Sequence, residues 1–291
     1  MKPGIDPKVD YAFKKVFGSE SNVDLLKLHL EAVLGFPLSA VEIVDPFEER
    51  DAADDKLCIL DIKARDADGR RFDVEMQTHS HPAIRPRLLY YWAQLYAGQL
   101  AEGQDFTELR PAYTICFLNA RMFAQRQDVY HNTFGLVDGA TGEEFSKHLG
   151  IHVLELPKFA LGSDDLRTMK EKWCYFLRHA ESLDTERMPA TMSDPPVMKA
   201  MEVLMKLSQS AIERDRYENR LKWERDVSVM KKAAYEQGEE KGRIAEIVGK
   251  IHLCQRALKE GLIPREELAQ KSFDELQRLA EEWEQRLLAS K

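Results

Sequence analysis

Two short segments in which apolar and polar residues alternate constrain the fold of this chain more than any other feature. They are residues 59–64 and 72–77, and their apolar members are Leu60, Ile62, Ala64, Phe72, Val74 and Met76. Because successive side chains of a β-strand point to opposite faces, each segment predicts a strand that is buried on one face only. Residues 65–70 between them are polar and include Gly69, as expected of a turn. The sequence therefore predicts an antiparallel hairpin with one apolar and one polar face.

The pattern elsewhere in the first two thirds of the chain predicts helices mixed with further strands. Apolar residues three and four positions apart predict helices over residues 10–36, 84–99 and 169–183. Apolar runs predict two more strands, over residues 112–118 and 152–156. This mixture predicts a domain of the α/β class.

The character of the sequence changes after Pro195 and Pro196. From there to the end it is almost entirely helical in pattern, rich in Lys, Arg and Glu, and nearly balanced in charge. We therefore predict a core domain over residues 1–190 and a helical extension over residues 197–291.

Composition narrows the class of protein. No run approaches the roughly 20 consecutive apolar residues of a membrane-spanning helix, and residues 1–6 lack the apolar core of a secretory signal. The four cysteines lie far apart without a CxxC pair, which is not the spacing of a disulfide framework. We therefore expect a cytoplasmic protein that is not bound to a membrane. The net charge of −8 at pH 7 argues against a protein that coats nucleic acid by bulk attraction.

The polar face of the predicted hairpin is the part of the sequence that can carry chemistry. Its members are Asp61, Lys63, Asp73, Glu75 and Gln77. In an antiparallel pair, Asp61 and Glu75 would repel each other unless a cation or a proton lies between them. Mg²⁺ suits this position, because it binds oxygen ligands and needs only one or two carboxylates besides water. From alternation alone, a hairpin whose charged face is simply solvated is the commoner case and needs no metal.

Several further motifs follow one another in a fixed order along the chain. They accompany Asp61 and residues 75–77 (EMQ), and they are residues 9–18 (VDYAFKKVFG), 85–92 (RPRLLYYW), 96–100 (YAGQL) and 111–115 (PAYTI). Together these motifs resemble the Rpn family of recombination-promoting nucleases, also called PD-(D/E)XK nuclease family transposases. The resemblance covers residues 5–160 and extends more loosely into the C-terminal part of the chain.

This resemblance implies a restriction-endonuclease-like core, in which helices flank a mixed central sheet, and metal-dependent cleavage of DNA linked to recombination or mobile elements. Asp61 and Glu75 would be the carboxylates that bind the metal, which is Mg²⁺ with Mn²⁺ as a substitute. Gln77 occupies the position at which the wider superfamily usually has a lysine, and glutamine there is common in this family. Asp10 would be a supporting acidic residue at the edge of the site.

Each of these residue types fits a step of phosphodiester cleavage. The reaction needs an activated water and neutralisation of an anionic transition state, and a divalent ion can supply both. Gln77 is uncharged, so it can only orient water or phosphate through its amide. Lys63 shares the strand face of Asp61, and we hypothesise that it supplies the missing positive charge. Arg85 and Arg87 could contact phosphate or belong to a solvated surface.

Other functions stay open on the sequence alone. The net charge and the missing lysine fit a catalytically weak or inactive relative that binds DNA or a partner protein. A third alternative is an interaction protein that assembles through its helical extension. Because cutting both strands of DNA usually requires two active sites, we expect a homodimer formed through the core or the C-terminal helices.

Overall fold

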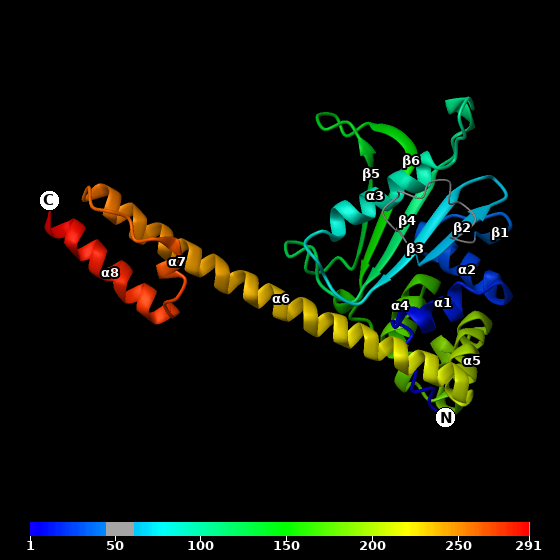
Figure 1. Cartoon of the computed structure of the whole chain (residues 1–291). Coiled ribbons are helices and arrows are strands. Elements are labelled where there is room, and N and C mark those ends of the chain that lie inside the picture. The colour runs from blue at the N-terminus through cyan, green and yellow to red at the C-terminus, as the bar shows by residue number, and fades with distance from the viewer. Residues whose placement is uncertain (45–60, 291) are drawn as a thin grey trace. The chain divides into compact units, whose positions relative to one another are not determined.

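A six-stranded β-sheet organises the N-terminal part of the chain in the computed structural model, which describes residues 1–44 and 61–290 (Figure 1). The strands follow one another across the sheet in the order β1-β2-β3-β4-β6-β5. Strand β4 runs parallel to β3 and to β6, and the other neighbours are antiparallel, so the sheet is mixed. The strands are β1 Val41–Val44, β2 Ile62–Asp66, β3 Arg71–Gln77, β4 Ala112–Leu118, β5 His131–Val137 and β6 Glu144–Glu155.

The predicted hairpin is confirmed. Strands β2 and β3 pair antiparallel, with Ile62 opposite Val74 and Ala64 opposite Phe72. Strand β2 begins at Ile62 and runs on to Asp66, beyond the predicted end at residue 64. The first two residues of the predicted strand, 59 and 60, lie outside the described residues.

Two strands of the sheet were not predicted, and one is longer than expected. The predicted strand 152–156 is the last part of β6, which begins at Glu144 and forms a long hairpin with β5. Strand β5 mixes polar residues with Gly135 and has irregular pairing near Leu136, so it lacks the alternation that identifies a strand. Strand β1 has only four residues, too few for a pattern.

The helices follow the predicted positions with one exception. They are α1 Asp10–Phe17, α2 Val23–Leu34, α3 Ile84–Ala97, α4 Met169–His179, α5 Pro195–Gln209, α6 Ala211–Ala257, α7 Arg265–Leu268 and α8 Phe273–Ala289. The single helix predicted over residues 10–36 is wrong: it is divided after Phe17 by Gly18 and a short 3₁₀ turn. Gly18 packs against the sheet, where an added Cβ would lie 3.0 Å from the Ile62 side chain. That contact places the chain reversal between α1 and α2.

The main hydrophobic core lies on one face of the sheet. Phe72, Val74 and Phe117 point from β3 and β4 into this core, where helices α1, α2, α4 and α5 cover them (Figure 1). The core includes five buried residues of α5: Val197, Ala200, Met201, Leu204 and Leu207. Helix α5 therefore packs on the sheet domain, although these residues belong to the range predicted as the helical extension.

Helix α3 covers the opposite face of the sheet. Its Ile84 and Leu88 pack on Cys116 in a second, smaller core. Since side chains alternate along a strand, Asp73 and Glu75 of β3 lie on this same face. Both are buried, so the polar face of the hairpin is not a solvated surface.

The chain divides into two compact units, Met1–Leu221 and Lys222–Lys291. The second unit has its own small core, built from the C-terminal part of α6 together with α7 and α8. The residues of this core are Ile251, Cys254, Leu268, Leu276, Ala280 and Trp283. Among the described residues, no helix combines the length and the apolar composition needed to cross a membrane.

Candidate active site

Asp61 and Glu75 are brought together where β2 begins. The backbone N–H of Asp61 donates a hydrogen bond to Oε1 of Glu75 at 3.2 Å. In return, Oδ2 of Asp61 accepts the backbone N–H of Met76 at 2.9 Å. The two carboxylates that the sequence selected therefore lie close together, Asp61 directly before β2 and Glu75 on β3, and each accepts a hydrogen bond from the backbone next to the other.

Gln77 and Arg87 complete the surroundings of Glu75. The Gln77 amide donates to Oε2 of Glu75 at 2.7 Å, so the residue in the usual lysine position orients the carboxylate. Arg87 of α3 approaches the same oxygen at 3.8 Å. Arg85, two residues before Arg87 on α3, instead donates to the backbone carbonyl of Met122 at 3.4 Å. Of the two arginines, only Arg87 reaches the candidate site.

The carboxyl groups of the site are buried close to one another. Burial, reinforced by the negative charge of Glu75, raises the pKa of Asp61 well above its usual value. The same two causes, in the same order, raise the pKa of Asp73 well above its usual value. Burial also raises the pKa of Glu75, against the opposing effect of the Asp61 backbone hydrogen bond. Without an added cation, the site thus disfavours the ionised carboxylates that a metal would require.

Asp73 was not among the residues selected from the sequence, and its environment bears on what the site can bind. Its side chain is fully buried, and the charge of Lys63 and a contact with the Thr114 side chain offset only part of the effect of burial on its pKa. Thr114 is its neighbour on β4 and is buried as well. Burying an acceptor that is incompletely hydrogen-bonded costs about 1–3 kcal/mol.

This donor set fits a hard divalent cation. Asp61, Asp73 and Glu75 offer only oxygen donors, and the charge of Glu75 raises the pKa values of both aspartates beyond the effect of burial. Within residues 1–44 and 61–290, no group of three or more His, Cys, Asp or Glu side chains is arranged to hold a metal ion, so an ion here would rely on fewer carboxylates and on water. Mg²⁺ typically binds through one or two carboxylates and fills its other positions with water or phosphate oxygens.

Asp10 lies near Asp61, and Lys14 contacts both carboxylates. One turn further along α1, Lys14 Nζ lies 3.0 Å from Asp10 Oδ1 and 3.5 Å from Asp61 Oδ1. Arg220 of α6 pairs with the other oxygen of Asp10 at 2.8 Å. Partial burial lowers the pKa of Lys14, but the charges of Asp61 and Asp10 outweigh it and raise the pKa above its ordinary value.

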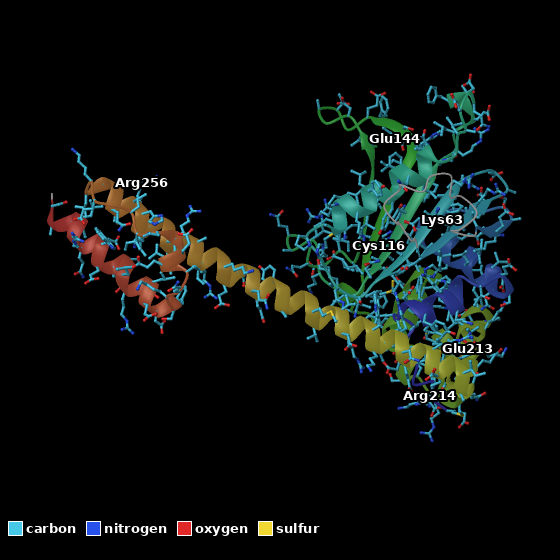
Figure 2. The ribbon with its side chains drawn as sticks, in the orientation of Figure 1. Lys63, Cys116, Glu144, Glu213, Arg214 and Arg256 are labelled. Atoms are coloured by element: carbon cyan, nitrogen blue, oxygen red, sulfur yellow. The ribbon has the colours of Figure 1, made fainter. Side chains whose placement is uncertain are left out.

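Lys63 lies two residues further along β2 than Asp61. The ladder places it opposite Asp73, and its charge lowers the pKa of that carboxyl group, opposing the larger effect of burial. Figure 2 labels Lys63 and Cys116 within the sheet region of the first unit. Cys116 pairs with Glu75 in the β3–β4 ladder, and burial together with the charge of Glu75 raises the pKa of its thiol well above its usual value.

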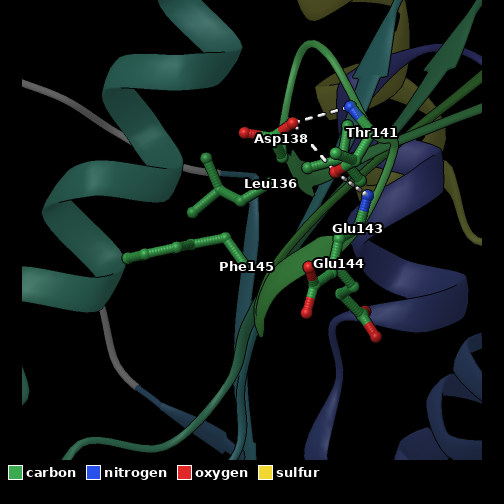
Figure 3. A pocket seen from close by; sticks show the side chains of 7 residues that line it. Leu136, Asp138, Thr141, Glu143, Glu144 and Phe145 are labelled. Atoms are coloured by element: carbon green, nitrogen blue, oxygen red, sulfur yellow. Dashed lines mark hydrogen bonds between the residues drawn. The ribbon is translucent and has the colours of Figure 1, made fainter.

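A separate hollow lies at the turn of the β5–β6 hairpin (Figure 3). The backbone N–H of Thr141 donates to Asp138 Oδ1 at 2.7 Å and shapes the turn. The exposed side chains of Leu136 and Phe145 form its apolar wall. None of the residues predicted to carry chemistry lines this hollow, so it does not belong to the candidate site.

Two residues near the candidate pair were not assigned a role by sequence reasoning, Asp73 and Lys14, whereas Arg87 was considered only as a possible phosphate contact. Asp73 was visible in the alternation, two positions before Glu75. Lys14 follows Asp10 by four positions, which on a helix predicts an ion pair. Its contact with Asp61, however, joins distant segments and has no local signal.

Comparison with known proteins gives one match. A model of one protein family, described as PD-(D/E)XK nuclease family transposase, matches residues 7–234. The matched range contains every side chain of the candidate site described above. Neither the curated proteins nor the solved structures include a match to this chain.

Proposed function

Because this chain belongs to the PD-(D/E)XK nuclease family transposases, we propose that it is a metal-dependent DNA endonuclease that acts in recombination or on mobile elements. Membership of this family implies a nuclease-like role, and DNA as its substrate. The finer proposal is that the chain hydrolyses phosphodiester bonds with the help of Mg²⁺ held by Asp61 and Glu75.

The observation that carries the proposal is the mutual contact of Asp61 and Glu75. Each carboxylate accepts a hydrogen bond from the backbone beside the other, at 3.2 and 2.9 Å. The Asp61 side chain is 13% exposed and the Glu75 side chain 2% exposed, so Glu75 is enclosed by protein while part of Asp61 remains accessible to solvent. Two acidic groups are seldom buried this close unless a cation or a proton is to be shared between them.

The protein residues have distinct roles in this proposal. Asp61 and Glu75 would hold the ion, and a bound divalent ion makes a coordinated water more acidic and offsets charge on the phosphate. Gln77 keeps Glu75 in one orientation by donating to its Oε2. Arg87, 3.8 Å from the same oxygen, places a positive charge on the side of the site covered by α3.

Nicking of supercoiled plasmid by the purified full chain tests the proposal. We expect nicked circles in the presence of Mg²⁺ or Mn²⁺ and none in EDTA. Asp61→Asn and Glu75→Gln should each lower the rate at least about 100-fold, because each removes a ligand charge. Glu102→Gln, a charge-to-amide change at an exposed position of the same unit, serves as the matched control and should cleave like the wild type.

Folding of the variants is checked independently. Both amides remove a negative charge from a buried cluster of like charges, so in EDTA the variants should melt no earlier than the wild type. Salt-sensitive DNA binding without nicking would favour the alternative, a relative that binds DNA but does not cleave it. Cleavage that survives both substitutions would refute the proposed site.

A further inference from the structure

We infer that Lys14 is the positioning residue that supplies the fixed positive charge of the candidate site, acting on Asp61 from helix α1. The inference rests on the proposed function and deepens it by assigning a role to a side chain outside the hairpin. Lys14 Nζ lies 3.5 Å from Asp61 Oδ1 and 3.0 Å from Asp10 Oδ1. It is thus an ammonium group placed between the two acidic residues that the sequence motifs selected.

Lys14 completes the restraint of Asp61. The Oδ2 atom of Asp61 accepts the Met76 N–H, which leaves Oδ1 to be fixed by another partner. The Lys14 ammonium lies on that oxygen. With both oxygens engaged, the carboxylate has one orientation relative to Glu75, and such orientation is what a metal-binding carboxylate needs from its neighbours.

The position of Lys14 is itself held by a chain of charges. Asp10 lies one turn earlier on α1 and anchors the ammonium, and Arg220 of α6 pairs with the second Asp10 oxygen at 2.8 Å. Charges therefore alternate in sign along Arg220, Asp10, Lys14 and Asp61. These contacts connect Arg220 to Asp61 and restrict the flexible side chain of Lys14 to one position.

Lys14 also remains accessible. Its side chain is 34% exposed, whereas Glu75 is 2% exposed. Its ammonium group can therefore face a phosphate while it contacts Asp61. The charge of Lys63, in contrast, acts on the fully buried Asp73, two ladder positions away from the contact between Asp61 and Glu75.

The test combines Mn²⁺ binding, measured by calorimetry, with plasmid nicking, and uses the full chain with Lys14→Met and Lys14→Arg. Methionine keeps the length of the lysine stem and removes its charge. We expect Lys14→Met to cleave at least about tenfold more slowly. Removing a positive charge beside the site favours cation binding, whereas the freer Asp61 carboxylate opposes it, so the Mn²⁺ affinity should stay within about tenfold of that of the wild type. Lys14→Arg should recover part of the cleavage rate.

The matched control is Lys15→Met, on the same helix. Lys15 pairs with Glu213 at 3.1 Å, away from the carboxylates of the site, so this variant should cleave and bind Mn²⁺ like the wild type. Slower cleavage combined with a Mn²⁺ affinity close to that of the wild type is a result that a merely structural role of Lys14 does not produce.

Three results would overturn the inference. Unchanged cleavage by Lys14→Met with loss of cleavage by Lys63→Met would assign the charge to Lys63. Parallel loss of cleavage and of Mn²⁺ binding in Lys14→Met would make Lys14 a structural residue only. A wild-type chain that neither binds Mn²⁺ nor nicks DNA would refute the proposed function itself, and the inference with it.

Discussion

His29 makes a prediction about stability that can be worked out from the structure. It lies on α2 and is fully buried, with ring centroids of Phe17 and Phe117 at 4.4 and 4.7 Å. Neither ring nitrogen has a hydrogen-bond partner among the described residues. Burial lowers the pKa of His29 from 6.5 to about 3. The imidazole is therefore neutral in the folded protein at every pH at which the chain is handled.

The pH dependence follows from this difference. Between pH 6.5 and pH 3 the unfolded chain binds a proton at His29 and the folded chain does not, so the free energy of unfolding falls as the pH falls. At pH 5 the unfolded state gains about 2 kcal/mol from this proton, whereas at pH 8 it gains almost nothing. Against a typical total stability of about 5–15 kcal/mol, such a loss is easily measured.

Urea unfolding of the wild type and of His29→Leu at pH 8 and pH 5 measures the effect. We expect the wild type to lose about 2 kcal/mol more than the variant between the two pH values. His131 and His152, whose pKa values are lowered by burial to about 4, titrate in the same range. Their contribution is present in both proteins and cancels in the difference. Equal losses in the wild type and the variant would refute the reasoning.

Two other substitutions, one in each unit, test the contribution of a buried ion pair and of a helix cap to stability. Lys158→Met should lower the free energy of unfolding of the first unit by about 3–5 kcal/mol in urea, because it leaves the fully buried carboxylate of Glu155 without its cationic partner at 2.6 Å. Lys147→Met, at an 82% exposed position, should change this free energy little. Equal effects of the two substitutions would contradict the argument. Ser272→Ala removes the cap that starts α8 and should cost the second unit about 1 kcal/mol in thermal unfolding followed by circular dichroism, whereas no change would show that the cap is dispensable.

The hairpin was predictable because its signal is local. Alternation over residues 59–64 and 72–77 and a turn with Gly69 are enough to define two paired strands. The mixed sheet flanked by helices, implied by the family resemblance, is also confirmed. Strand β5 was not predicted because it lies at the sheet edge, is mostly exposed and contains Gly135, so its sequence lacks the alternation of a half-buried strand.

The surroundings of the site were less predictable than its central pair. That Asp61 and Glu75 meet follows from the pairing of two neighbouring strands. The approach of Lys14 depends on how α1 packs across the sheet. Lys14 and Asp61 are 47 positions apart in the sequence, so their contact leaves no local pattern. The burial of Asp73 likewise depends on α3, which covers a face that alternation alone would leave to solvent.

The anomalous diffraction of Mn²⁺ in crystals of the full chain tests the central claim most directly. We predict a Mn²⁺ peak within bonding distance of carboxylate oxygens of Asp61 and Glu75, and its loss in Glu75→Gln crystals grown in the same solution. A Mn²⁺ ion bound elsewhere, with Asp61 and Glu75 contacting only the protein at saturating metal concentration, would contradict the assignment of these carboxylates to a metal-dependent nuclease site.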